Sequence, residues 1–446
     1  MIFSKKKVTV TISFATVLIA LAVIAATGAG GIVAWEHQNS DAFCTNTCHA
    51  VHPEEPRAHK LGFHARVQCV ECHEGRLPTL HLMRSKFEHV HQLWNMIAGY
   101  ERPTKATALR PLRASCEGCH WPAVVHDDSL RVKTRYATDP KSTETRYRME
   151  LHTGFGAVRD NQAKGIHWHI AQEVDYVALD DYNQKIALVE VRGADGKKKT
   201  YVAENAGKSR EELGAMRKSR MECIDCHSSV GHPFRNPADL VDEAIVSGEI
   251  DRTLPSTKAL AVKLIGEAGK LYGTPEELAP QFDKLIAETL PKREQTAETK
   301  EQDKKFATAM KRILLQTSFA QKGINWKTFP FNTGHKDFPG CFRCHDGKHL
   351  DEKGEAIRFQ CTLCHALPKV VREDGARSVA STIIPGVTPP DFHEAPNWMR
   401  DHPAQMMDPS CKTCHGKIEY GQDGGSFCSN PACHGRTYPG VNQPEK

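Results

Sequence analysis

The sequence predicts a mostly α-helical and irregular fold with one N-terminal transmembrane helix and a small β-meander insertion. Three observations predict this fold. All sixteen cysteines lie in short motifs that end in Cys-His, a long uncharged stretch follows the N-terminal lysines, and a block of alternating apolar and polar residues separates two motifs. Hydrophobic residues make up only 39% of the 446 residues. We therefore expect bound groups to replace much of the usual aliphatic core.

The first expected element is a membrane anchor over residues 1–35. Three lysines, at 5–7, precede an uncharged stretch at 8–34, and about 20 apolar residues suffice to cross a bilayer. The lysines should stay inside, which gives a single-pass protein of the cytoplasmic (inner) membrane with its N-terminus inside and the rest periplasmic. A cleaved signal peptide is the alternative, but its apolar region usually spans about 7–15 residues. The length of this stretch favours an uncleaved anchor.

Cysteine and histidine recur in eight motifs of one kind. Six are strict Cys-x-x-Cys-His, while the first and last have three and four residues between their cysteines. In c-type haem attachment, two thiols form thioethers to the porphyrin and the adjacent histidine ligates iron. Zinc sites give no reason for a histidine after every second cysteine, and a disulfide framework predicts none. The sequence therefore predicts a multihaem c-type cytochrome with haem-organised loops and eight covalently bound c-type haems.

The motifs assign the attachment residues directly. The thioether cysteines are Cys44, Cys48, Cys69, Cys72, Cys116, Cys119, Cys223, Cys226, Cys341, Cys344, Cys361, Cys364, Cys411, Cys414, Cys428 and Cys433. The proximal iron ligands are His49, His73, His120, His227, His345, His365, His415 and His434. Because the chain has 24 histidines, enough remain for a second axial histidine at every iron. Such bis-histidine ligation suits electron transfer rather than substrate chemistry.

The spacing of the motifs divides the chain behind the anchor. We expect a tetrahaem domain at 36–240, a helical spacer at 241–327 and a second tetrahaem domain at 328–446. Alternating segments at 174–179, 185–192 and 200–202 predict a β-meander inserted at about 172–204. Apolar residues at three- and four-residue spacing predict spacer helices at 256–267, 275–290 and 298–322.

A further helix is expected at 79–98, after the second motif. Its apolar stripe consists of Leu80, Met83, Phe87, Val90, Trp94 and Ile97. A stripe with a tryptophan and flanking cations, close to an anchor, fits a helix that lies on the lipid surface. An amphipathic helix packed against haem fits the same periodicity.

Residues 1–235 resemble the NapC/NirT family of membrane-anchored tetrahaem quinol dehydrogenases, which includes NrfH. The anchor, the closely spaced first motifs and the long helix carry this resemblance. So do Cys223-Ile-Asp-Cys-His227 with His232 five residues later, and Gly165-Ile-His167-Trp-His169. The family oxidises menaquinol at the outer membrane face and passes electrons through haems to a soluble partner. The resemblance implies that His232, His64 and one of His167 and His169 are distal haem ligands.

The resemblance also places Lys86 at a quinol site near the haem of Cys44 and Cys48. Quinol oxidation releases two electrons and two protons, so it needs a haem edge, an apolar slot and a base. Glu88, His89 and His91 are the candidate bases, and Lys86 would hydrogen-bond the quinol oxygen. The plainer interpretation is that Lys86 and Glu88 are solvated surface residues and that His89 or His91 ligates iron.

The chain departs from the family at its first motif. Family members often have methionine two residues after the motif histidine, where this chain has Val51. His49 is then the simplest proximal ligand, and His52 or His37 the distal one. Four further haems also follow the tetrahaem part. Their expected distal ligands are His335, His349, His393 and His402, with Met406 and Met407 as alternatives near the last motifs.

The favoured function is an electron conduit from menaquinol to periplasmic multihaem cytochromes or a reductase, in anaerobic or metal respiration. The alternatives are a terminal reductase of a small oxyanion and an electron-transfer subunit of a larger membrane complex. A Cys-x-x-Cys-Lys motif, the usual nitrite-reductase signature, is absent from the sequence. The net charge of +5 omits the haem propionates, so it does not indicate nucleic-acid binding. The expected partners are menaquinol, membrane lipid and redox proteins, with no nucleic acid.

Overall fold

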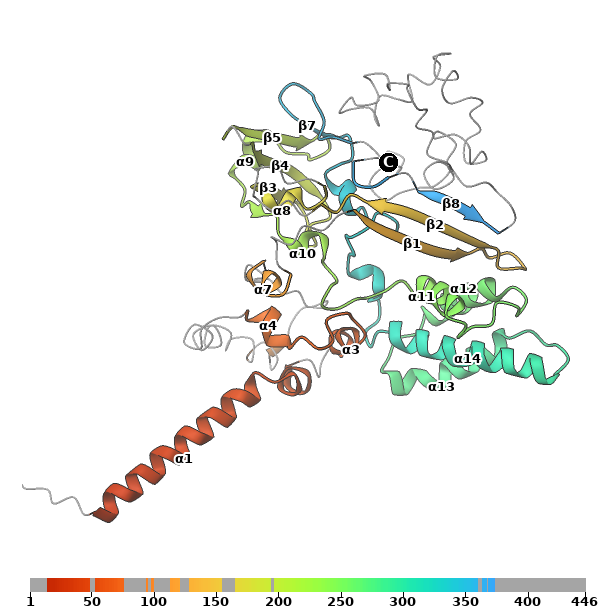
Figure 1. Cartoon of the computed structure of the whole chain (residues 1–446), viewed down its shortest axis with the longest axis horizontal. Coiled ribbons are helices and arrows are strands. Elements are labelled where there is room, and N and C mark those ends of the chain that lie inside the picture. Colours follow the sequence, from red (N-terminus) through yellow and green to blue (C-terminus); the bar gives the residue numbers. More distant parts are fainter. Residues whose placement is uncertain are drawn as a thin grey trace, which may run out of the picture. The chain divides into compact units, whose positions relative to one another are not determined.

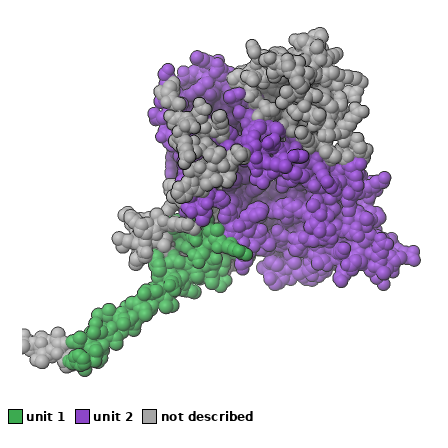
Figure 2. All heavy atoms as spheres, in the orientation of Figure 1, with its two compact units in different colours: residues 1–56, 66–110 green, residues 57–65, 111–446 purple. Residues whose placement is uncertain are grey.

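The structure is a computed structural model of the whole chain (Figure 1). It describes residues 14–48, 53–75, 94, 98–99, 113–120, 128–154, 165–193, 196–359, 363–366 and 368–373. The chain divides into two compact units (Figure 2). Unit 1 contains 1–56 and 66–110, and unit 2 contains 57–65 and 111–446.

Unit 1 begins with the apolar helix α1, Phe14–Gln38. An 18-residue window of this 25-residue helix has a mean hydropathy of 2.4, and none of that window is buried within the protein. At about 1.5 Å per residue this helix exceeds the roughly 30 Å hydrocarbon core of a bilayer. The helix is therefore long and apolar enough to cross a membrane, as the sequence predicts.

The elements that the structure describes after α1 in unit 1 are short. They are α2 (Asp41–Phe43), the π-helical turn η1 (Cys44–Cys48), the start of α3 (Glu54–Lys60) and α4 (Cys69–His73). Ser40 caps α2 by accepting a hydrogen bond from the Phe43 amide at 3.2 Å. Asp41 in α2 accepts a hydrogen bond from the Cys69 amide at 2.9 Å. The first two Cys-His motifs are thus tied together close behind α1.

Unit 2 contains two antiparallel sheets. One has the order β1-β2-β8, from Ser129–Tyr136, Glu144–Leu151 and Lys369–Arg372. The other has the order β6-β3-β4-β5-β7, from Ser219–Arg220, Val174–Ala178, Ile186–Arg192, Lys198–Ala203 and His349–Leu350. Strands β3, β4 and β5 correspond to the three strands of the expected meander. Residues 186–190 of β4 are all buried, because the sheet packs against the short helix α9 (Arg210–Ala215) on one face and near Cys344 on the other.

The β1–β2 hairpin and the small outer strands were not predicted. Strand β1 carries Arg131, Lys133 and Arg135 between less polar residues, and its residues 130–133 are exposed. Strands β7 and β8 come from the C-terminal part of the chain and pair with β5 and β2. These pairings join strands from both predicted tetrahaem domains within unit 2.

The predicted spacer forms a helical cluster with an apolar core of its own. Its helices are α11 (Pro237–Val246), α12 (Thr257–Ala268), α13 (Pro275–Thr289) and α14 (Ala297–Thr317), which lie together in Figure 1. Fully buried side chains from all four helices meet in the core, among them Val241, Leu264, Phe282, Phe306 and Ile313. The expected replacement of aliphatic core by haem therefore does not extend to this segment. The helical cluster begins at residue 237, four residues before the predicted start of the spacer.

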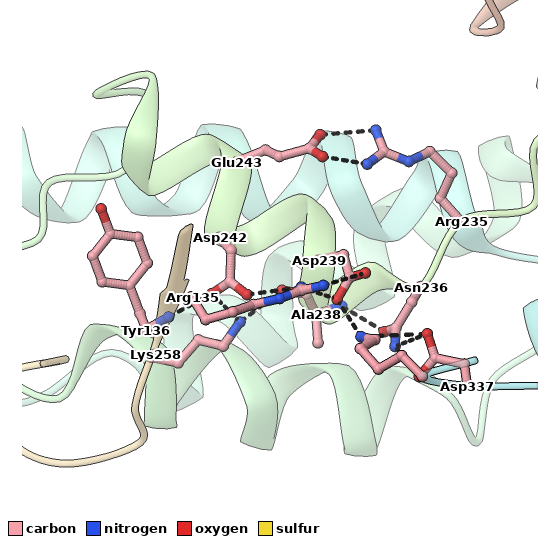
Figure 3. Close-up of polar contacts among 11 residues, drawn as sticks. Arg135, Tyr136, Arg235, Asn236, Ala238, Asp239, Asp242, Glu243, Lys258 and Asp337 are labelled. Carbon is pink, nitrogen blue, oxygen red and sulfur yellow. Dashed lines mark hydrogen bonds and ion pairs between the residues drawn. The ribbon is translucent and has the colours of Figure 1, made fainter. Parts of the chain in front are cut away.

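A buried ion network fastens this helical cluster to strand β1 (Figure 3). Lys258 and Asp242 are each about 95% buried and form an ion pair of 2.5 Å. Asp242 also accepts a hydrogen bond from Arg135 at 3.2 Å, and Arg135 pairs with Asp239. Lys336 binds the same Asp239 carboxylate at 2.6 Å. The network therefore joins β1, α11, α12 and the loop that carries His335.

Acid should weaken this network through Asp239. Burial raises the pKa of Asp239, but Arg135 and Lys336 outweigh it and hold the pKa below the ordinary 3.8. The unfolded chain therefore takes up this proton first, so the stabilisation is complete above about pH 4 and is lost as pH falls through the folded-state pKa. Thermal unfolding of Asp239→Asn between pH 6 and pH 3 should show a weaker loss on acidification than wild type. Parallel wild-type and variant curves would contradict this role.

Candidate functional site

The described motifs form short helical turns. They lie in α4, α7 (Arg113–Glu117), α10 (Cys223–Cys226) and η5 (Gly340–Arg343). In three of them the histidine amide donates to the carbonyl of the first cysteine, at 2.7 Å for His120, 2.8 Å for His227 and 3.0 Å for His345. Residues three apart lie on one side of a helical turn. The strict spacing thus places both cysteines on one side, as attachment to two vinyl groups of one porphyrin requires. The first motif has one more residue between its cysteines, and the wider π-helical turn η1 accommodates it.

Cysteines of successive motifs lie against one another. In unit 2 the side chains of Cys116 and Cys223 lie close enough to interact, as do those of Cys341 and Cys364. Cys226 is close enough to Cys341 for their charges to interact. Four motifs, at 116–120, 223–227, 341–345 and 361–365, therefore form one continuous row. In unit 1 the side chains of Cys69 and Cys44 lie close together in the same way.

A histidine from elsewhere in the chain faces each motif histidine of this row. The ring centroids are 6.0 Å apart for His64 and His120, 6.5 Å for His167 and His227, 5.7 Å for His169 and His345, and 6.2 Å for His335 and His365. Four of the expected distal histidines thus lie opposite expected proximal ones. The pair of His169 and His345 crosses the predicted boundary between the two tetrahaem domains.

The contacts of His169 and His345 indicate what the space between two facing rings can hold. Their Nε2 atoms are 3.5 Å apart. The Nδ1 of His169 donates to the Ile166 carbonyl at 2.8 Å, and that of His345 to the Arg358 carbonyl at 2.6 Å. A neutral imidazole that donates from Nδ1 carries its lone pair on Nε2. The two lone pairs therefore point at each other, an arrangement that repels unless a cation lies between them.

The protonation state of these rings also suits a metal. Burial lowers the pKa of His345 to about 4, and it lowers the pKa of His169 as well. Both rings are therefore neutral near pH 7, and neutral imidazole is the form that ligates metals. Two imidazole nitrogens that each lie about 2 Å from one ion are about 4 Å apart, close to the observed spacing. The pair fits the two axial positions of a haem iron.

Backbone carbonyls orient other rings of the row. His167 donates from Nδ1 to the Thr153 carbonyl at 2.9 Å, and His365 to the Ala366 carbonyl at 2.7 Å. Such partners fix the tautomer and ring orientation of metal-ligating histidines. Burial also lowers the pKa of His227 and of His335. The row thus presents neutral and oriented imidazoles at several of its members.

His349 does not share this geometry. It is 2% exposed, and its Nε2 donates to the Ile186 carbonyl at 3.0 Å while its Nδ1 lies 2.9 Å from Asp346. Both nitrogens are engaged within the protein. This geometry argues against the prediction that His349 is a distal ligand and favours a structural role for it.

The structure brings together one further histidine pair. His232, an expected distal ligand, faces His59 with ring centroids 6.1 Å apart. His59 was missed by sequence reasoning, although it lies in α3, the helix that leads to His64. A histidine five residues before another was the one signal that could have singled it out.

Several predicted site residues lie outside the described residues. They are Lys86, Glu88, His89 and His91 of the quinol site, the proximal His49, His415 and His434, and the distal His52, His393 and His402. Cys361, Cys411, Cys414, Cys428, Cys433, Met406 and Met407 lie outside as well. The described residues therefore cover, in whole or in part, the first six motifs.

Comparison with known proteins gives one relevant similarity. The chain is 34% identical over 390 residues to the cytochrome c-type protein ImcH of Geobacter sulfurreducens. The matched region covers 86% of this chain and 73% of that protein. No family model matches the chain, and no solved structure matches it.

Proposed function

Because the chain belongs to the family of the cytochrome c-type protein ImcH, we propose that it is a membrane-anchored c-type cytochrome with eight covalently bound haems. It oxidises menaquinol at the outer face of the cytoplasmic membrane and relays electrons to periplasmic redox partners. The resemblance of residues 1–235 to the NapC/NirT family supports the quinol part of this proposal. The row of motifs in unit 2 supports the relay part.

The observation that carries the proposal is the row of contacting motif cysteines with facing histidines. Bound haem would supply an iron that accepts and releases one electron at a time. The closeness of Cys116 to Cys223, and of Cys341 to Cys364, would place successive haem attachment points near one another. The facing histidines would fill both axial positions and orient each ring. Short and fixed steps of this kind are what an electron relay requires.

The anchor and the first motif support electron entry at the membrane. Helix α1 ends at Gln38, and Cys44 follows six residues later. The Asp41 bond to the Cys69 amide holds the second motif beside the first. A haem attached at Cys44 and Cys48 would therefore lie close behind the membrane-crossing helix, where a lipid-dissolved quinol arrives.

A terminal oxyanion reductase is the weaker alternative. Substrate reduction at haem needs an iron with an open axial position, whereas bis-histidine ligation fills both positions. Facing histidines occur at the four described motifs of unit 2. This arrangement favours the relay.

Replacing Lys86 by methionine tests the quinol site. We expect menaquinol oxidation to slow about tenfold or more, because a hydrogen bond from a charged group contributes about 1.5–3 kcal/mol. The measurement is the rate of haem reduction by a menaquinol analogue in membranes, at equal haem absorbance. Lys60→Met, at an exposed position in α3, is the control and should keep the wild-type rate. An unchanged rate in Lys86→Met would remove Lys86 from the site.

A further inference from the structure

Arg343 occupies an unusual position between the two cysteines of the motif at 341–345. Its guanidinium donates three hydrogen bonds to backbone carbonyls: Nε to Gly340 at 2.9 Å, Nη1 to Asn183 at 2.9 Å and Nη2 to Asp225 at 2.6 Å. These carbonyls belong to its own loop, to the β3–β4 turn and to the motif at 223–227. A single side chain thus connects two successive haem-attachment loops.

Asp225, which Arg343 binds in the neighbouring motif, is itself held in place by hydrogen bonds. Asp225 is 8% exposed, and its carboxylate accepts hydrogen bonds from the Tyr176 hydroxyl at 2.6 Å and the Glu222 amide at 2.7 Å. Asn183 donates from its side chain to the same Tyr176 hydroxyl at 2.9 Å. Arg343 thus binds the carbonyls of Asn183 and Asp225, and the side chains of these two residues are both hydrogen-bonded to the buried Tyr176. This rigid support allows Arg343 to set the spacing of the two loops.

The positive charge of Arg343 is not cancelled by an ion pair. All three of its acceptors are uncharged carbonyls, and no carboxylate within the described ranges lies at ion-pair distance from it. Arg343 lies between Cys341 and Cys344 in sequence, and its Nη2 donates to the carbonyl of Asp225, the residue before Cys226. The charge therefore lies beside both haem-attachment motifs.

We propose that Arg343 is a positioning and potential-setting residue for the haems attached at Cys223/Cys226 and Cys341/Cys344. Reduction of each iron from Fe(III) to Fe(II) adds one electron, and a nearby cation in a partly buried site stabilises that added charge. Charge and burial around the site are among the means by which a protein tunes a haem potential. Arg343 raises the potentials of these haems and so draws electrons across the junction between the two loops. The inference rests on the proposed haem attachment and not on the identity of the electron donor.

The test is a spectroelectrochemical titration of the purified full-length protein with its haems. Arg343→Gln, which removes the charge, should lower at least one midpoint potential while the low-spin haem content stays constant. Arg343→Lys, which keeps the charge, should restore the wild-type potential in large part. Arg220→Gln is the matched control. Its guanidinium is ion-paired with Asp175 on the neighbouring strand, and its loss should leave every midpoint in place.

Two outcomes would overturn the role of Arg343. One is a set of midpoints in Arg343→Gln that matches wild type, and the other is an equal shift in Arg343→Lys and Arg343→Gln. Absence of covalent haem from the wild-type protein would overturn the proposed function together with this inference. Haem-loaded wild type with unchanged variant midpoints would overturn the Arg343 role alone.

Discussion

Replacing His169 by alanine is expected to convert one low-spin iron into a high-spin one. His169 faces His345 with 3.5 Å between the two Nε2 atoms, so its loss would leave the iron of the motif at 341–345 with one axial histidine. An open axial position changes the spin state of haem iron and admits small ligands. The measurement is electron paramagnetic resonance of the oxidised protein, together with its binding of a small ligand such as carbon monoxide after reduction. We expect a high-spin signal of one haem per chain.

His349→Gln is the matched control, because His349 lies in the same part of the chain but has both nitrogens engaged. We expect this variant to keep the wild-type haem spectrum. It should lose about 1–3 kcal/mol of unfolding free energy, since buried partners are left unsatisfied. A high-spin signal in His349→Gln, with none in His169→Ala, would reverse the two assignments.

Replacing Lys258 by methionine is expected to destabilise the helical cluster strongly. Loss of one partner from a buried ion pair costs about 3–5 kcal/mol, because an uncompensated charge stays buried. We expect the lower end of this range, since Arg135 still binds Asp242 at 3.2 Å. Urea unfolding followed by far-ultraviolet circular dichroism would measure the loss in the α11–α14 transition.

Two controls separate the buried pair from a general effect of charge removal. Lys284→Met removes an exposed partner of Glu288 at 3.9 Å, and such pairs contribute about 0–1 kcal/mol. The double variant Lys258→Met with Asp242→Leu should recover much of the stability, because apolar replacement of a buried pair is often neutral. Equal stability of Lys258→Met and Lys284→Met would contradict the importance of the buried pair.

Local sequence signals predicted the long helices α1, α12, α13 and α14 and the meander. Helices α12, α13 and α14 lie within one residue of their expected starts, because a long apolar stripe with capping residues is a strong local signal. Strand β4 was predicted from its run of apolar residues. The β1–β2 hairpin was missed although Arg131, Lys133 and Arg135 alternate with less polar residues, which is a period-two strand signal. Its third strand, β8, lies far along the chain and could not be paired with it from the sequence.

Distal histidines could be proposed from the sequence, but they could not be assigned to particular motif histidines. The resemblance implied one of His167 and His169 as a ligand, and the structure places both opposite motif histidines, His227 and His345. Residues two apart near a helical turn point in different directions, so neighbours in sequence can serve different irons. His335 faces His365, which lies 30 residues further along the chain. Such pairings depend on tertiary structure, which residue spacing does not encode.

Reduction of the protein in membranes by a menaquinol analogue tests quinol-driven electron relay through the haems. The account predicts that the analogue reduces the haems, that a quinol-site inhibitor blocks this reduction, and that the oxidised protein shows only low-spin iron. A chemical reductant supplies the control for total haem. Haems that the chemical reductant reduces but the menaquinol analogue does not would contradict the account.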